Sequence, residues 1–324
     1  LLFCLFADDT SIFEKGLFEE YIEQKTNEDG SDLAAHLSQI FEVLNTHKEK
    51  RLKNLDESLH MFPFVNGKLF EEHLPVASFD SEMRKIIMEC CQLNWGKISP
   101  AIFGSLFQSV MNPKERRNLG AHYTSETNIL KLIKPLFLDE LWKEFENIKD
   151  NKNKLGEFHR KISTYKFLDP ACGCGNFLII TYRELRLLEL EVLRALNKSG
   201  QRVIDVSSII LIDVDQFYGI EYEEFPARIA EVAMWLIDHQ MNMLISNEFG
   251  QYFVRLPLKK AAQIHHGNAL RTDWESIVSK NELSFIIGNP PFLGKKEQNV
   301  NQKSDMDFVF GSIKGSGVLD YVTA

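Results

Sequence analysis

Two short motifs of this sequence combine residue types that suit chemistry on a small polar group. The first, Asp-Pro-Ala-Cys-Gly-Cys-Gly-Asn-Phe at residues 169–177, lies between an apolar run and a long stretch with helical spacing. Glycines at such a junction let the backbone approach a ligand closely and expose amide N–H groups at the start of the helix. The loop therefore suits a carboxylate or a phosphate, although dinucleotide-binding enzymes use a longer glycine pattern.

The second motif is Asn289-Pro290-Pro291-Phe292, which follows the apolar run Phe-Ile-Ile-Gly. Proline donates no ladder hydrogen bond, so a strand must end there. The proline rings also hold the Pro290 carbonyl in place and add no competing N–H. The side-chain oxygen of Asn289 and the Pro290 carbonyl are then two rigid acceptors, and Phe292 supplies a ring for stacking. A strand that merely ends in a rigid turn would explain the prolines but not the Asn and the Phe together.

Further polar residues follow other apolar runs. A ligand that contains a ribose needs an acid at the end of the next strand, and two acids compete for this role. Hydropathy slightly favours Asp213, at the end of Ile-Ile-Leu-Ile-Asp, over Glu221, at the end of Phe-Tyr-Gly-Ile-Glu. A third run is followed by Gly-Asn-Ala-Leu-Arg-Thr-Asp-Trp, which offers Asn268 and Asp273; for Asp273 a helix cap is the simpler interpretation.

Alternating strands and helices must position these residues. From about residue 119 the apolar patterns alternate in this way, which predicts an α/β fold with a parallel sheet whose ligands bind at the carboxyl ends of the strands. Residues 1–118 have mainly helical spacing, clearest at 31–45 and 81–95, with a small hairpin expected at 61–75. The sequence thus predicts a helical domain at 1–118 and an α/β domain at 119–324.

The overall composition excludes several classes of protein. The net charge of -9 argues against a uniformly basic coat for nucleic acid, although a local basic groove remains compatible with it. Five cysteines, an odd number, do not form a disulfide framework and favour a reducing cytoplasmic setting. No apolar run approaches the length of a membrane span, and no set of residues has the spacing of a metal site. We expect the chain to be an internal piece of a longer protein.

The glycine motif resembles the S-adenosylmethionine loop of the amino-methyltransferases that act on nucleic acids. Gly-Ile-Glu at 219–221 followed by an amphipathic helix, and Gly-x-x-Tyr-Thr at 120–124, resemble two further motifs of that family. Their order matches the adenine-N6 DNA methyltransferases in which a target-recognition domain follows the catalytic domain. More narrowly, the runs that begin at residues 1, 104 and 219 look like the MmeI-like single-chain type II restriction–modification enzymes, and this resemblance covers nearly the whole chain.

The resemblance implies a Rossmann-like S-adenosylmethionine-dependent methyltransferase fold, incomplete in this chain, behind a helical spacer. It favours Glu221 over Asp213 as the ribose acid, and it sets Asn268 where the family usually has an Asp that binds the adenine amine of the cofactor. It implies a catalytic role for Asn289, Pro290, Pro291 and Phe292. It also implies that the cofactor binds Tyr123, Thr124, Asp169, Ala171, Gly173, Gly175, Glu221, Tyr222 and Asn268.

The partner that the resemblance implies is double-stranded DNA with one adenine flipped out of the helix. Lys295 and Lys296, and Lys114, Arg116 and Arg117, are candidate phosphate contacts. Nuclease and target-recognition domains are expected elsewhere in the full-length protein. Alternative hypotheses are a scaffold or specificity-coupling module without catalysis, methylation of RNA, of a protein glutamine or of cytosine N4, and a nicotinamide-dependent oxidoreductase.

Overall fold

The computed structural model describes residues 1–65, 70, 77–105, 124–197, 208–250, 262–313 and 319–321. The chain divides into two compact units, the first built chiefly from Leu1–Ser99 and the second chiefly from Pro100–Met241 and Ala262–Ala324. The boundary that the sequence suggests, near residue 118, lies outside the described residues. The limits 1–118 and 119–324 therefore stay a prediction.

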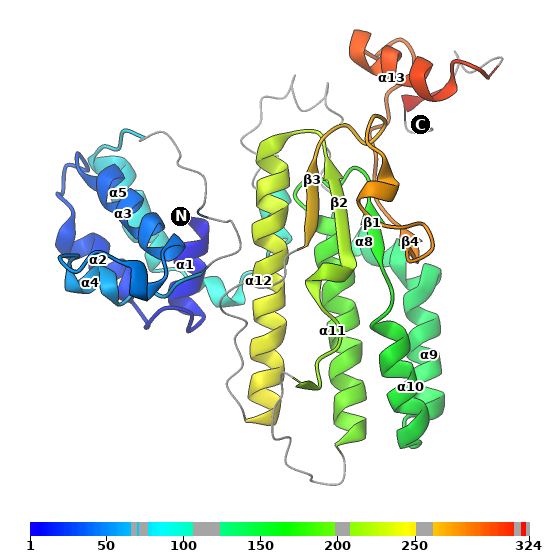
Figure 1. The fold of residues 1–324 in the computed structure, drawn as a ribbon, viewed down its shortest axis with the longest axis horizontal. Coiled ribbons are helices and arrows are strands. Elements are labelled where there is room, and N and C mark those ends of the chain that lie inside the picture. The colour runs from blue at the N-terminus through cyan, green and yellow to red at the C-terminus, as the bar shows by residue number, and fades with distance from the viewer. Residues whose placement is uncertain are drawn as a thin grey trace. The chain divides into compact units, whose positions relative to one another are not determined.

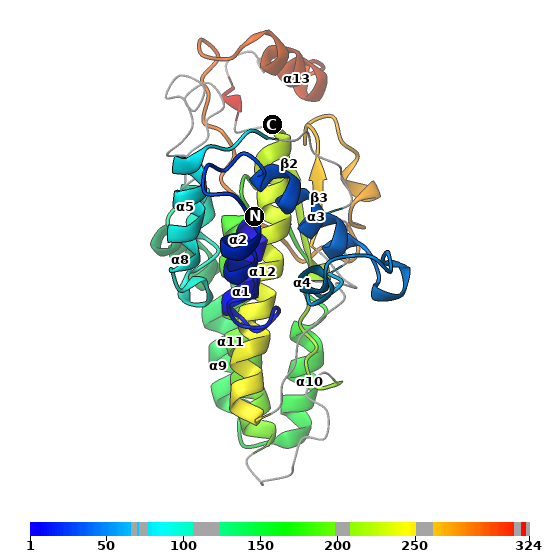
Figure 2. The same cartoon turned by 90° about the vertical axis from the view of Figure 1, so that its left-hand side faces the viewer.

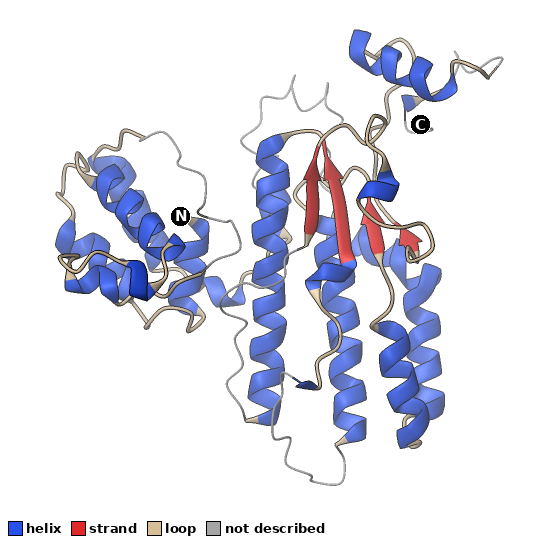
Figure 3. Cartoon of the chain, in the orientation of Figure 1, coloured by secondary structure: helices blue, strands red, loops and turns tan. Residues whose placement is uncertain are grey.

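The described part of the first unit consists of helices and loops (Figure 3). It contains α1 (Leu2–Asp9), α2 (Leu17–Lys25), α3 (Leu33–Asn45), α4 (Glu57–His60) and α5 (Ser81–Cys91), with the 3-10 turns η1 (Lys48–Lys50) and η2 (Trp95–Lys97). The helices predicted at 31–45 and 81–95 are confirmed as α3 and α5. Most of the hairpin predicted at 61–75 lies outside the described residues.

Charged side chains from distant positions satisfy the helix ends of this unit. The Asp8 carboxylate accepts from the backbone N–H of Phe18, 2.9 Å away, and of Glu19 at the start of α2. Arg51 donates to the carbonyls of Val43 and Phe62, both at 2.9 Å. The apolar face predicted for α5 is only partly buried: Ile87 is covered, whereas Met83, Ile86 and Leu93 are exposed. Helical periodicity thus located α5 but overestimated how much of its face is covered.

The second unit contains a four-stranded parallel sheet in the order β3-β2-β1-β4 (Figures 1 and 3). Its strands are β1 (Phe167–Asp169), β2 (Phe217–Glu221), β3 (Gln263–His266) and β4 (Phe285–Ile286). Phe167 is in register with Phe217 and Phe285, and its ring stacks between theirs at centroid distances of 5.1 and 5.3 Å. One row of aromatic rings therefore fixes three neighbouring strands in a common register.

The described helices of this unit are α8 (Glu126–Ile133), α9 (Asp139–Ile148), α10 (Lys152–Ile162), α11 (Asn176–Leu196), α12 (Glu224–Phe249) and α13 (Val300–Phe310). α11 lies between β1 and β2 in the chain and α12 between β2 and β3, and both helices run beside the strands in Figures 1 and 2. The helix predicted at 127–137 is α8 continued by the π-helix η3 (Lys134–Leu138). Pro135, which lacks an N–H, lies where the α pattern stops.

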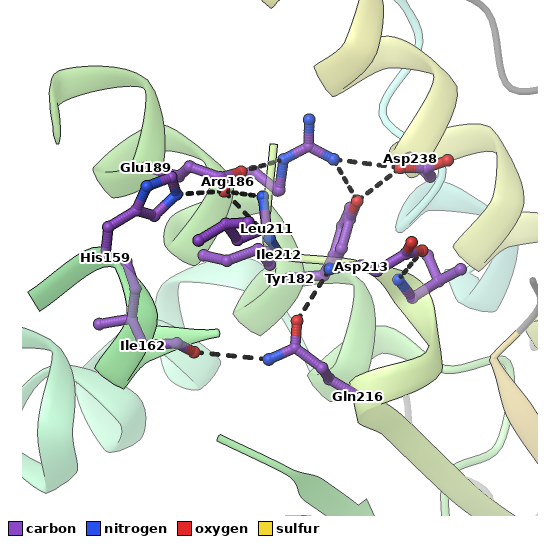
Figure 4. Close-up of polar contacts among 11 residues, drawn as sticks. His159, Ile162, Tyr182, Arg186, Glu189, Leu211, Ile212, Asp213, Gln216 and Asp238 are labelled. Atoms are coloured by element: carbon purple, nitrogen blue, oxygen red, sulfur yellow. Dashed lines mark hydrogen bonds and ion pairs between the residues drawn. The ribbon is translucent and has the colours of Figure 1, made fainter. Parts of the chain in front are cut away.

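A buried charge network joins α10, α11 and α12 (Figure 4). Arg186 contacts Glu189 at 3.0 Å and Asp238 at 3.1 Å, and the Tyr182 hydroxyl donates to Asp238 at 2.5 Å. The other oxygen of Glu189 accepts from His159 Nε2 at 2.7 Å and from the backbone N–H of Leu211 and Ile212. Burial alone would raise the pKa of Glu189, but His159 and Arg186 outweigh it and hold that pKa below its usual value.

The network predicts a large cost for removing its only guanidinium. Arg186→Met should destabilise the second unit by about 3–5 kcal/mol, because two buried carboxylates lose their shared partner. The same substitution at Arg194, an exposed residue of α11 that pairs with Glu248, should cost about 0–1 kcal/mol. Urea unfolding followed by circular dichroism measures both, and equal losses for the two variants would contradict this assignment.

Candidate active site

The parallel pairing of β1 with β4 brings the two sequence motifs to the same edge of the sheet. The Ile287 N–H donates to the Leu168 carbonyl at 2.9 Å, so the chain leaves β4 beside the end of β1. A side-chain carbon added to Gly288 would overlap the Asp169 carboxylate, which explains why the position before Asn289 is a glycine. The glycine loop and the two prolines therefore follow the ends of two adjacent strands.

The glycine loop bends tightly over the end of β1. Gly173 and Gly175 have left-handed φ values of 54° and 83°, which side chains other than that of glycine rarely adopt. The Ala171 N–H donates to Asp169 at 3.0 Å, and the Gly175 N–H donates to the Cys172 carbonyl at 2.8 Å. Nothing lies within 4 Å of the position that a Gly173 side chain would take. The loop thus leaves open space next to its backbone.

Glu221, at the carboxyl end of β2, binds the backbone of the glycine loop. One oxygen accepts from the Gly173 N–H at 2.8 Å and the other from the Glu223 N–H at 2.9 Å. The loop amide that the sequence suggests for a ligand is therefore bound by a carboxylate of the chain itself. Each oxygen of Glu221 retains acceptor capacity, because a carboxylate offers about four lone-pair directions.

The competing acid lies elsewhere. Asp213 caps the 3-10 helix η5 (Val214–Gln216), accepting from the Val214 N–H at 2.7 Å, and it precedes β2. The apolar run before it is not a strand: residues 209–213 lead into η5. Asp213 is consequently at the amino end of β2, whereas Glu221 is at the edge where the loop and the prolines meet.

Two carboxyl groups at this edge are held away from water. Burial raises the pKa of Asp169 to about 8, and the neighbouring Glu221 adds to the effect although the Ala171 N–H opposes it. Burial also raises the pKa of Glu221, against the opposing N–H groups of Glu223 and Gly173. Burial thus disfavours the charged form of both carboxyl groups at this edge.

Asn289 meets the segment that precedes α8. Its Nδ2 donates to the Thr124 hydroxyl at 3.1 Å, a contact between residues 165 positions apart. The Asn289 side-chain oxygen has no protein partner in the described part of the chain. The start of α8 is fixed in turn by an ion pair of 2.6 Å between Glu126 and Arg183 of α11. Tyr123 lies outside the described residues, so its predicted role is untested.

Aromatic side chains flank this point. Pro290 and Pro291 are half-buried, whereas Phe292 is 69% exposed and Tyr222, after Glu221, is 56% exposed. Both rings are therefore accessible to a ligand at this edge of the sheet. Lys295 and Lys296 follow and are exposed. Lys114, Arg116 and Arg117 lie outside the described residues.

Asn268 follows β3 at the same edge. Its side-chain oxygen accepts from the Leu270 N–H, and its Nδ2 donates to Asp305 of α13, both at 2.9 Å. Asp273 caps the 3-10 helix η6 (Trp274–Ser276) through the Glu275 N–H, which agrees with the simpler interpretation. Sequence reasoning missed Asp305, because an acid on a polar helix looks solvated; only its burial, at 6% exposure, distinguishes it.

Neither a metal centre nor a membrane span is found in the part of the chain that the structure describes. No three His, Cys, Asp or Glu residues are grouped there to hold an ion. Cys172 and Cys174 are buried thiols, and burial with the nearby Glu221 raises the pKa of Cys174 to about 12. No described helix is long and apolar enough to cross a membrane.

Comparison with known families agrees with this geometry. Residues 145–324 match the family model described as the MmeI DNA-methyltransferase domain, and residues 1–70 match the MmeI helicase spacer domain. The chain belongs to the MmeI family. This confirms the resemblance seen in the sequence and the predicted α/β methyltransferase fold behind a helical spacer.

Individual relatives are longer than this chain. A DNA methyltransferase A of Bacillus subtilis (strain 168) is 43% identical over 329 residues, which cover all of this chain and 37% of the relative. A putative type II restriction enzyme and methyltransferase of Methanocaldococcus jannaschii is 26% identical, over 73% of this chain and 24% of the relative. A solved structure of the type IIL restriction–modification enzyme MmeI in complex with DNA is 64% identical, with a TM-score of 0.94, and covers 99% of this chain and 43% of that one. The chain thus spans less than half the length of these relatives.

The buried acid at the end of β1 predicts a stability that depends on pH. An acid whose pKa is raised on folding stabilises the fold below its unfolded value, near 4, and this stabilisation is lost as the pH rises through about 8. Asp169→Asn mimics the protonated acid and should raise the melting temperature at pH 8, by roughly 2–4 °C for each 1 kcal/mol of stability recovered in a unit of this size.

At pH 4.5, without added ligand, Asp169→Asn and the unaltered protein should melt at nearly the same temperature. Glu157→Gln, at an exposed position of α10, is the matched control and should change neither value. A melting temperature that Asp169→Asn lowers at pH 8 would refute the assignment.

Proposed function

We propose that this protein transfers a methyl group from S-adenosylmethionine to the N6 amine of adenine in double-stranded DNA. The observation that carries the proposal is the 3.1 Å contact between Asn289 and Thr124. It lies at the edge of the sheet where the glycine loop follows β1. This contact joins the acceptor motif to the segment predicted to touch the cofactor. Membership of the MmeI family supports the DNA substrate.

The residues around the glycine loop fit the cofactor. The space in front of Gly173 admits a ligand close to the backbone. Glu221 retains acceptor capacity for two ribose hydroxyl groups, and the exposed ring of Tyr222 beside it suits the face of an adenine. Asn268 lies at the end of the next strand for the adenine amine. When bound there, S-adenosylmethionine would supply an electrophilic methyl group to the substrate nitrogen and would leave as the neutral thioether.

The turn after β4 activates the substrate amine. The lone pair of an adenine amine is delocalised into the ring, which makes this nitrogen a poor nucleophile. The Asn289 side-chain oxygen and the Pro290 carbonyl accept its two hydrogens from fixed positions, so the nitrogen shifts toward tetrahedral geometry and its lone pair points at the methyl group. Phe292, exposed beside them, stacks on the base once it has left the duplex. One amine proton passes to water after transfer, and no strong general base is needed.

The thioether product tests the cofactor assignment without catalysis. Calorimetric titration of S-adenosylhomocysteine should show binding, and Glu221→Ala should weaken it tenfold or more, because a charge-assisted hydrogen bond contributes about 1.5–3 kcal/mol. Glu224→Gln, an exposed acid at the start of α12, is the control and should bind like the unaltered protein. Equal heats for Glu221→Ala and the unaltered protein would remove Glu221 from the ribose site.

Catalysis is tested at Asn289 in the full-length protein. Asn289→Ala should lower methylation at least about 100-fold while the affinity for S-adenosylhomocysteine stays within twofold, because this amide acts on the substrate amine. Asn281→Ala, at an exposed loop position, should keep full activity. Transfer of labelled methyl to DNA, followed by nucleoside mass spectrometry, measures the rate and the product.

Each alternative hypothesis predicts a different product. N4-methylcytosine, or label confined to RNA or protein, would overturn the proposed substrate, and no transfer at all would favour a scaffold. Sequencing of the DNA of the source organism with and without the gene should show N6-methyladenine that disappears with the gene. We propose further that the full-length protein belongs to a restriction–modification system, as the names of the relative from Methanocaldococcus jannaschii and of the type IIL enzyme MmeI indicate for those proteins.

A further inference from the structure

A buried carboxylate in α13 has no role in the mechanism above. Asp305 is one of two buried residues in this helix, the other being Met306. Its carboxylate accepts from Arg271 Nε at 2.7 Å, from Asn268 Nδ2 at 2.9 Å and from the Tyr321 hydroxyl at 3.2 Å. We name Asn268, Arg271, Asp305 and Tyr321 the Asp305 cluster. Burying a carboxylate costs free energy unless it is paired, so these three hydrogen bonds indicate a structural or functional role for Asp305.

The cluster fixes which way the Asn268 amide points. A carboxylate only accepts hydrogen bonds, and a backbone N–H only donates them. Nδ2 of Asn268 must therefore face Asp305, and its oxygen must face the Leu270 N–H, 2.9 Å away. That oxygen keeps one lone pair. An amide usually can rotate to exchange its two ends, but here either end would meet the wrong partner after rotation.

The position of Asn268 connects this orientation to the proposed cofactor site. The Gly267 N–H donates to the Glu221 carbonyl at 2.8 Å. Asn268, the next residue in the chain, is therefore close to Glu221, the proposed ribose acid. The Tyr222 carbonyl lies 3.1 Å from His266 Nε2 at the end of β3. The Tyr321 hydroxyl donates to the same Asp305 carboxylate at 3.2 Å, and burial together with that carboxylate raises the pKa of Tyr321. The cluster therefore lies at the adenine end of the proposed site.

Arg271 attaches the rest of α13 to the loop after β3. Its NH2 donates to the carbonyl and hydroxyl oxygens of Ser304 at 2.8 and 3.0 Å, and its guanidinium lies 4.2 Å from the centre of the Phe308 ring. Because little of α13 is buried by apolar contact, these polar contacts hold the helix beyond the carboxyl edge of the sheet (Figure 1).

We infer that Asp305 is a positioning residue, which holds Asn268 with its side-chain oxygen directed at the adenine amine of the cofactor. The inference rests on the proposed function. It also explains why an amide suits position 268: an Asp there would face Asp305 at hydrogen-bond distance, and two carboxylates so close repel each other.

Two ligands distinguish a change in the orientation of the Asn268 amide from a general loss of the binding site. S-inosylhomocysteine differs from S-adenosylhomocysteine in carrying a carbonyl oxygen in place of the adenine amine and a hydrogen on the ring nitrogen N1. The position that the amine occupies therefore has no hydrogen to donate to Asn268. The unaltered protein should bind the adenine compound at least tenfold more tightly, since a site built for a donor rejects an analogue that lacks it. Both dissociation constants are measured by calorimetry on the full-length protein.

In Asp305→Asn the oxygen of the new amide pairs with the Arg271 cation and turns its NH2 toward Asn268, which must then rotate. Affinity for S-adenosylhomocysteine should fall about tenfold, while affinity for the inosine analogue stays within twofold. Asp307→Asn makes the same change at an exposed position of α13 and should alter neither. Thermal melting of each variant establishes that it is folded.

A second pair of variants tests the same contact by exchange. Asn268→Asp alone should weaken S-adenosylhomocysteine binding about tenfold, and the double variant Asn268→Asp/Asp305→Asn, which restores one acid facing one amide, should return to within threefold of the unaltered protein. Loss of both ligands to an equal degree, or an unchanged preference in Asp305→Asn, would overturn the inference. Failure of the unaltered protein to bind S-adenosylhomocysteine would instead overturn the proposed function, and the inference with it.

Discussion

The parallel pairing of β1 with β4 is the contact on which the site depends. Both strands are short, and β4 has only two residues, so their hydrogen bonds alone would hold them weakly. The stacked rings of Phe167, Phe217 and Phe285 supply the missing cohesion, and Phe137 of η3 packs on two of them. Because the glycine loop leaves β1 and the two prolines follow β4, packing inside the sheet decides where the polar groups at its edge meet.

Buried carboxyl groups have different partners in two parts of this α/β unit. Behind the sheet, Arg186 lies between Glu189 and Asp238, and each carboxylate has further donors. At the carboxyl edge, Asp169 and Glu221 are enclosed with backbone N–H groups as their partners, and the pKa of each is raised. The first arrangement stabilises the helical layer. The second leaves acceptor capacity for a ligand at some cost in stability, which is common at functional sites.

The sequence predicted the positions of the motifs well, because glycine and proline end strands for local steric reasons and parallel strands place their carboxyl ends together. Local patterns failed where tertiary structure decides. The apolar residues before Asp213 look like a strand, yet they lead into a 3-10 turn whose cap is Asp213 itself. Periodicity likewise could not show that Met83 and Ile86 of α5 stay exposed. Asp305 has a neighbour on the chain at Asp307 that looks equivalent, and only the fold buries one of the two.

The contact between Thr124 and Asn289 also has a consequence for biosynthesis. The two residues are 165 positions apart, and ribosomes add roughly 5–20 residues per second, so about 8–33 s separate their appearance. From the time β2 is made until β4 follows, β1 is an outer strand with an uncovered hydrogen-bonding edge. The nascent chain therefore passes through a stage in which the glycine loop exists without the two prolines beside it. The unpaired N–H and C=O groups of such an edge can pair with strands of other unfinished chains. Slow translation between these positions would therefore favour aggregation over folding.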